Sequence, residues 1–88
     1  MWIVELAFEL PAPPERLALR PQHRERLKAH KAAGELVMAG PLTDGTGAFM
    51  VWTGPDEESV RALMAEDPYY TAPTVSVASL REWDPLPL

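Results

Sequence analysis

Residues 35–53 read ELVMAGPLTDGTGAFMVWT, and this stretch decides the fold. Two apolar runs, Glu35 to Ala39 and Gly47 to Thr53, are each typical of a β-strand. Gly40 and Pro41 end the first run, because glycine and proline interrupt regular structure. The loop between the runs contains an aspartate–glycine pair, which is an ordinary turn signal. The stretch therefore predicts two successive strands joined by a compact loop.

A helix is predicted before these two strands. Pro21 suits the first turn of a helix, where its missing N–H has no partner to lose. The same proline is expected to forbid one continuous helix that would include a short helical turn at residues 15–19. The helix is therefore predicted from about Pro21 to Ala33, with Gly34 as its C-terminal cap. His30, near its end, is expected to face solvent or the helix edge.

A second helix follows the two strands, and one further strand lies at each end of the chain. Asp56 is a good N-cap for the helix, which Asp67 closes. Trp2 to Phe8 alternates in a manner typical of a strand, and Thr74 to Trp83 is rich in β-branched residues. The order βαββαβ predicts one α+β domain over residues 1–88, a ferredoxin-like antiparallel sheet with helices on one face.

The face of the sheet that carries no helix is expected to be an interface between two copies of the chain. The strand at 47–53 has apolar residues on both of its sides, including Phe49 and Val51 on one side and Met50 on the other. A large uncovered apolar face is unusual on a monomer. Packing one sheet against another would cover it, so we expect a homodimer.

The composition excludes several classes of function. The net charge of −5, from 13 acidic and 8 basic residues, argues against nucleic acid or an anionic membrane as partner. The absence of cysteine excludes thiolate catalysis, and no glycine-rich phosphate loop or persuasive metal motif is present. Since these motifs are missing, no metal or cofactor is expected. No signal peptide and no apolar run of membrane length is found, so a cytoplasmic protein is expected.

Chain direction brings chemically active residues to one end of the predicted sheet. With right-handed crossovers, the start of the first helix, the loop after the second strand and the end of the second helix all lie there. The candidate site residues on these segments are Arg20, His23, Gly40, Pro41, Asp67 and Tyr69.

His23 and Asp67 have both a catalytic and a structural interpretation. A histidine in the first helical turn is favoured in its neutral form, which a general base requires, and a nearby carboxylate would orient it. Alternatively, His23 is a structural hydrogen-bonding residue, and Asp67 caps a short turn that begins at Pro68.

The remaining candidates also have two interpretations. Arg20 can hold a carboxylate substrate through a bidentate pair, or it is a solvated surface arginine. Tyr69 and Tyr70 can line a pocket, or they contribute to the core or to the dimer contact.

Three motifs in order resemble the YCII-related domain family. They are the Arg20-Pro21-Gln22-His23 run, the stretch AGELVMAGP over residues 33–41, and AEDPY over residues 65–69. The resemblance covers nearly the whole chain. It implies a dimeric α+β barrel of the ferredoxin-like type, and it matches His23 and Asp67 to the histidine and aspartate proposed as catalytic in the family. The loop between Pro41 and Gly47 is shorter than in some relatives.

Two functions from different classes follow as hypotheses. Most members of the family have no assigned reaction, but one branch resembles muconolactone isomerases and one relative is a dehydrochlorinase. The first hypothesis is therefore a cofactor-independent lyase or isomerase that acts on a small polar or carboxylated molecule, with His23 as general base and Asp67 orienting it. The alternative is a non-catalytic ligand-binding or interaction module. An oxygen-using monooxygenase of the same fold is weaker, because no residue points to oxygen chemistry.

Overall fold

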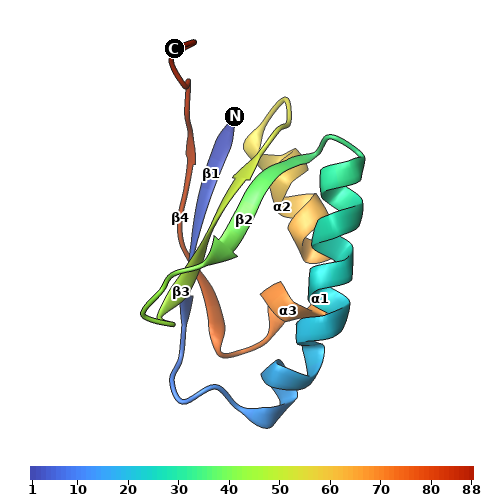
Figure 1. The fold of residues 1–88 in the computed structure, drawn as a ribbon, viewed down its shortest axis with the longest axis vertical. Helices are drawn as coiled ribbons and strands as arrows, with labels where there is room; N and C mark the ends of the chain where they lie inside the picture. The colour runs from blue at the N-terminus through green and yellow to red at the C-terminus, as the bar shows by residue number, and fades with distance from the viewer.

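A four-stranded antiparallel sheet carries three helices on one of its faces, as Figure 1 shows for the computed structural model, which describes residues 1–88. None of these helices has the length and apolar character that crossing a membrane requires. In chain order the elements are β1 (Trp2–Phe8), α1 (Pro14–Ala32), β2 (Leu36–Pro41), β3 (Gly47–Trp52), α2 (Glu57–Ala65), α3 (Pro68–Thr71) and β4 (Val75–Glu82).

The strand order β2-β3-β1-β4 confirms the predicted ferredoxin-like α+β fold. β1 and β3 are central, with Val4 opposite Met50, and each also pairs antiparallel with one edge strand. The short helix α3 is the one element beyond the βαββαβ order. Asp67 caps it, as the structural interpretation of that residue expected, since Oδ1 accepts the backbone N–H of Tyr69 at 2.9 Å.

The core lies between the sheet and the helices and is small, with 13 of 88 residues buried. Alternation along the central strands turns Val4, Leu6, Met50 and Trp52 toward the helices, where α2 contributes Val60 and Met64. A chain of this length buries a limited fraction of its surface, which agrees with the short list of core residues.

The prediction that Pro21 would separate two helices is wrong, because α1 continues from Pro14 to Ala32 with Pro21 inside it. Proline removes one backbone hydrogen bond, to the carbonyl of Leu17, and favours a bend. Leu17 is exposed, so water can satisfy the free carbonyl. Figure 1 shows the first turns of α1 set at an angle to the rest of the helix. The helix ends as predicted, with Gly34 at a positive φ of 78°.

The strand β2 extends two residues further than predicted, to Pro41. Proline is tolerated there because β2 is an edge strand, where a backbone N–H on the outer side needs no partner. The extension matters for the site, since it holds Gly40 and Pro41 in regular register opposite Phe49 and Ala48.

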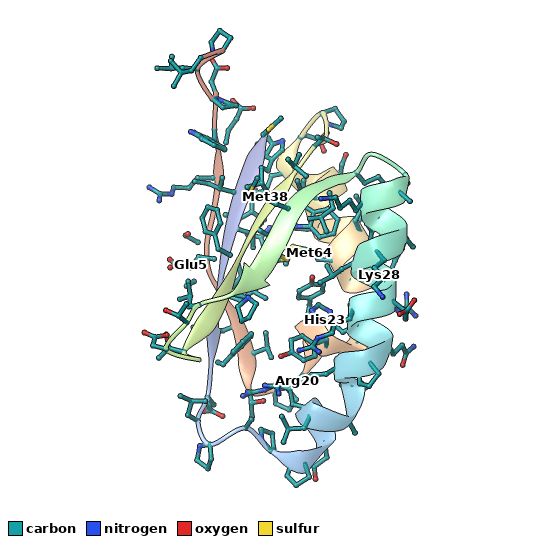
Figure 2. All side chains as sticks on the ribbon, in the orientation of Figure 1. Glu5, Arg20, His23, Lys28, Met38 and Met64 are labelled. Carbon is teal, nitrogen blue, oxygen red and sulfur yellow. The ribbon has the colours of Figure 1, made fainter.

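The face of the sheet away from the helices is partly apolar, as predicted. The side chain of Phe49 on β3 is 40% exposed and that of Met38 on β2 is 58% exposed. Val51 pairs with Met38 on one side and with Ile3 on the other. Figure 2 shows Glu5, from the centre of the sheet, pointing away from the helices on this same side.

Candidate active site

A cavity of about 330 Å³ lies between α1 and the sheet. Its floor comes from residues of β1, β2 and β3 that face the helices, and its wall comes from one side of α1. Such a volume is at the lower end of the range for small-molecule sites. The lining residues are Leu6, Phe8, Arg20, His23, Arg24, Leu27, Ala39, Gly40, Pro41, Ala48, Met50 and Tyr69.

His23 and Asp67, 44 positions apart in the chain, form a short hydrogen bond. Nδ1 of His23 lies 2.6 Å from Oδ2 of Asp67, and the Asp67 side chain is 3% exposed. When the carboxylate is ionised and the ring is neutral, Nδ1 is the donor and Nε2 carries the lone pair, because an ionised carboxylate only accepts hydrogen bonds. No protein group hydrogen bonds to Nε2, and His23 lines the cavity. The pair therefore presents a free imidazole nitrogen to a small molecule.

The local sequence Asp67-Pro68 positions the carboxylate. Pro68 begins α3 with its φ already suited to a helix, and Asp67 is the N-cap with an extended backbone. One carboxylate oxygen is used by the cap and the other by His23. Asp67 is thus fixed from two sides and has no rotational freedom to exchange partners.

The imidazole of His23 is held between two tyrosines. Its ring stacks on that of Tyr69 with centroids 4.1 Å apart, and it meets the ring of Tyr70 edge-on at 5.1 Å. Burial, with the charge of Asp67 as a smaller cause, raises the pKa of Tyr70. Tyr70 therefore stays protonated at neutral pH, and its hydroxyl donates to Sδ of Met50 at 3.0 Å.

The other residues expected at the site from sequence lie around the same cavity. Arg20 on α1, Gly40 and Pro41 on β2, and Tyr69 on α3 all contribute to its lining. Figure 2 shows His23 and Arg20 on the side of α1 that faces the sheet, whereas Lys28 lies on its outer side. Asp67 stands behind His23 and is not part of the lining.

Arg24 also lines the cavity, and the sequence interpretation missed it. Arg24 follows Arg20 by four residues, so it lies on the same side of the helix. That spacing was the signal that could have identified it.

Arg16 is the second residue that was missed. It is 2% exposed and supports the end of the sheet beside the cavity. Its guanidinium donates to the backbone oxygens of Glu9 and Thr74 and to the Thr74 hydroxyl, at 2.9 to 3.0 Å, and it lies 5.0 Å from the centre of the Phe8 ring. An arginine is rarely buried without an acid, so its sequence pattern gave no signal.

His30 does not face solvent, which was one of the two positions expected for it. Its side chain is 14% exposed, Nδ1 lies 2.9 Å from Oε1 of Glu35, and its ring packs edge-on against Trp52 at 5.3 Å. His30 follows His23 by seven residues, which places it on the same side of α1, facing the sheet. His30 lies outside the cavity lining, so it forms a second and separate histidine–carboxylate pair.

No three or more histidine, cysteine, aspartate or glutamate side chains cluster in an arrangement that could hold a metal ion. The groups that the structure brings to the cavity are an imidazole with a carboxylate behind it and two guanidinium groups.

A family model for the YCII-related domain matches residues 1–84. The chain belongs to the YCII-related family. This confirms the resemblance drawn from the three sequence motifs. No curated protein matches the sequence significantly.

A solved structure of similar fold is that of an enzyme. The chain is similar to the 5-chloro-2-hydroxyhydroquinone dehydrochlorinase TftG from Burkholderia phenoliruptrix AC1100, in complex with 2,5-dihydroxybenzoquinone, with a TM-score of 0.70 and 20% identity. The match covers 96% of this chain and 94% of that one. At this identity the similarity shows that the YCII-related domain and the dehydrochlorinase share a fold.

Proposed function

We propose that this YCII-related protein is a cofactor-independent lyase or isomerase that moves a proton on a small polar or carboxylated organic molecule. The observation that carries the proposal is the 2.6 Å hydrogen bond between His23 and a buried Asp67, at a cavity into which His23 is free to offer Nε2. A buried carboxylate behind an imidazole is the arrangement that orients a general base and stabilises its protonated form.

The proposed roles follow the chemistry of each group. Nε2 of His23 accepts a proton from a carbon or oxygen of the substrate, and the carboxylate of Asp67 stabilises the imidazolium that results. In an elimination, the electron pair of the broken C–H bond forms a C=C bond and the leaving group departs as an anion. Arg20 binds an anionic group of the substrate, and Gly40, Pro41 and Tyr69 shape the cavity around it.

The similar structure supports the lyase form of the proposal. The dehydrochlorinase acts on a small oxygenated ring, and its complex contains another such ring, 2,5-dihydroxybenzoquinone. The cavity here has an apolar floor that includes Leu6, Phe8 and Met50, which suits a flat carbon skeleton.

The test is proton exchange at carbon, because it needs no knowledge of the complete reaction. A panel of small carboxylic acids, hydroxylated quinones and hydroquinones, with 5-chloro-2-hydroxyhydroquinone among them, is incubated with the protein in D₂O and followed by proton NMR and chloride release. The wild type is expected to exchange or convert at least one compound, and His23→Ala to lose that activity while remaining folded. A folded His23→Ala protein with full turnover would remove His23 from the mechanism.

A non-catalytic ligand-binding module is the second candidate, and one observation favours it. Asp67 caps α3 and the ring of His23 stacks on Tyr69, so the pair also stabilises the fold. Under this alternative His23→Ala lowers the melting temperature markedly, and no compound of the panel is converted by the wild type.

We also propose that the protein is a homodimer whose copies pack through the helix-free face of the sheet. Met38 and Phe49 supply exposed apolar surface there. Glu5 lies opposite Phe49 in the strand register, and Arg81 lies opposite Ile3. Because Ile3 and Glu5 are two residues apart on β1, the acid and the base lie on the same face of the sheet. In a two-fold dimer the same patch meets itself, so the face that carries these two charges would meet a face that carries both signs of charge.

A further inference from the structure

Two guanidinium groups on successive turns of α1 line the cavity without a carboxylate partner. Arg20 and Arg24 are four residues apart, both contribute to the lining, and both remain exposed where a ligand can reach them. Neither is part of any ion pair in the structure. The ion pairs are His23–Asp67, Lys28–Glu25, His30–Glu35 and Arg61–Glu57.

The lining contains no acidic side chain that could neutralise these two charges. Asp67, which lies just behind His23, has one oxygen bound to that histidine and the other bound to the backbone of Tyr69. Like charges four residues apart on a helix destabilise it. Arg20 and Arg24 therefore oppose the stability of the free protein, and an anion in the cavity would reverse that effect.

The basic residues at the cavity contrast with the acidic character of the chain as a whole. The protein carries a net charge of −5, yet α1 contains six of its eight lysine and arginine residues and only two of its thirteen acidic residues. The remaining segments therefore hold two basic and eleven acidic residues. A positive wall next to an apolar floor attracts small anions into the cavity, while the acidic remainder repels them elsewhere.

Arg16 adds a third positive charge one turn before Arg20. It is buried, its hydrogen-bond partners are neutral oxygens of Glu9 and Thr74, and it lies against the Phe8 ring, which lines the cavity. No acid of the protein is paired with it, so its charge adds to the positive potential at this end of α1.

We propose that Arg20 and Arg24 together bind a small organic acid with two anionic groups. A guanidinium group binds a carboxylate through two parallel hydrogen bonds. The two guanidinium groups on this side of the cavity can therefore bind two carboxylates of one ligand. The apolar floor of Leu6, Phe8 and Met50 holds the carbon skeleton between them. This inference rests on the proposed function for the identity of the site and names the substrate class, a dianionic acid.

The experiment measures binding and does not require turnover. The probes are benzoate, the three benzenedicarboxylates and the matching neutral diamides, titrated into the wild type by calorimetry at millimolar concentration and low salt. The variants are Arg20→Gln and Arg24→Gln. The control is Lys28→Gln, which removes the same charge from the outer side of α1, where the lysine side chain is 74% exposed.

At least one dicarboxylate is expected to bind the wild type about tenfold or more tightly than benzoate, as one extra charge-assisted pair implies. The neutral diamides are expected not to bind. In Arg24→Gln and in Arg20→Gln the dicarboxylate and benzoate should bind almost equally, while Lys28→Gln should keep the wild-type preference. Absence of binding by every dicarboxylate, a preference no larger than twofold, or a preference that survives in Arg24→Gln would each overturn the inference.

Repeating the titration with His23→Ala separates this inference from the proposed function. A dianion preference that persists in this variant supports the two-arginine site, whatever becomes of proton exchange. Conversely, proton exchange that depends on His23 without any dianion preference would leave the proposed function standing and remove the substrate class.

Discussion

The imidazole of His23 stacks on the phenol ring of Tyr69, with ring centroids 4.1 Å apart and an angle of 12° between their planes. Asp67 fixes both partners, since Oδ1 accepts the backbone N–H of Tyr69 and Oδ2 accepts from Nδ1 of His23. Carboxylate, imidazole and phenol thus hold one another as a unit. A change at Asp67 therefore reaches the face of His23 that lines the cavity.

Asp67→Asn is expected to keep the fold and to change the tautomer of the His23 imidazole, so that the proton moves from Nδ1 to Nε2. The amide oxygen can still cap α3, but its NH₂ group then faces Nδ1 of His23, which must become an acceptor. Nε2 then carries the proton and cannot act as a base, so turnover should fall by roughly 10²- to 10⁴-fold. Nitrogen-15 NMR of the imidazole measures the tautomer directly, without a substrate.

Asp67→Ala is the control for this prediction, because it removes the cap as well as the partner of His23. It is expected to destabilise the fold by about 1–3 kcal/mol. If Asp67→Asn showed the wild-type tautomer, the carboxylate would not be what orients the imidazole.

The sequence predicted the parts of this site that depend on chain direction. The alternation of apolar residues along the strands and the prolines between elements predicted the βαββαβ order. Right-handed crossovers then predicted that His23 and Asp67 lie at one end of the sheet. The structure brings the two within hydrogen-bond distance. Their catalytic roles stay a prediction.

The residues that the sequence did not reveal depend on contacts between distant segments. Arg16 binds backbone oxygens of Glu9 and of Thr74, 58 positions away, and no local pattern marks an arginine that will be buried by such contacts. Arg24 was missed for a simpler reason. A helix expected to start at Pro21 leaves Arg20 outside it, so the four-residue spacing of Arg20 and Arg24 was not used, whereas the observed helix contains both residues.

Arg16→Ala is expected to destabilise the fold by about 3 kcal/mol or more, because it removes three charged hydrogen bonds made by a side chain that is buried. Arg16→Lys keeps the charge but cannot reach Glu9 and Thr74 together, so it should recover only part of the loss. Urea denaturation measures both. Arg61→Ala, which breaks an exposed pair with Glu57, is the control and should cost no more than about 0.5 kcal/mol. Equal effects of Arg16→Ala and Arg61→Ala would contradict the structural role of Arg16.

Gly47→Ala is expected to disrupt the pairing of β1 and β3. A Cβ at Gly47 would collide with the backbone carbonyl of Leu6, which cannot move without breaking the ladder. We expect a loss of about 2 kcal/mol or more. Gly40→Ala on the neighbouring strand provides a matched control, because no atom lies within 4 Å of the added carbon. Thermal denaturation of the two variants should separate them clearly, and similar melting temperatures would be inconsistent with the register described.

The N-cap of α2 is expected to make stability depend on pH at the acid end. The side chain and the backbone N–H of Ser59 both donate to Oδ1 of Asp56, and these bonds lower the pKa of Asp56 below its usual 3.8. A pKa lower in the folded than in the unfolded state stabilises the fold above the unfolded value, and the effect disappears as pH falls through the folded value.

Asp56→Ala should therefore melt below the wild type at neutral pH, and the difference should shrink as pH falls below about 3.8. Asp56→Asn keeps an acceptor for the cap but has no charge to lose. Its melting temperature should lie between the other two at neutral pH, with less change on acidification. A wild-type advantage over Asp56→Ala that does not depend on pH would show that the carboxylate charge is not what stabilises the cap.

Phe49→Glu and Met38→Glu are expected to convert a dimer into monomers. Both side chains are exposed on the helix-free face, and a carboxylate placed there would be buried without a partner between two sheets. Sedimentation velocity should give twice the mass of one chain for the wild type and the mass of a single chain for either variant. Lys28→Glu on the outer side of α1 adds negative charge away from that face and should leave the dimer intact. A wild type that sediments as a monomer at high concentration would show that Met38 and Phe49 remain in contact with water, and the interface would have to be abandoned.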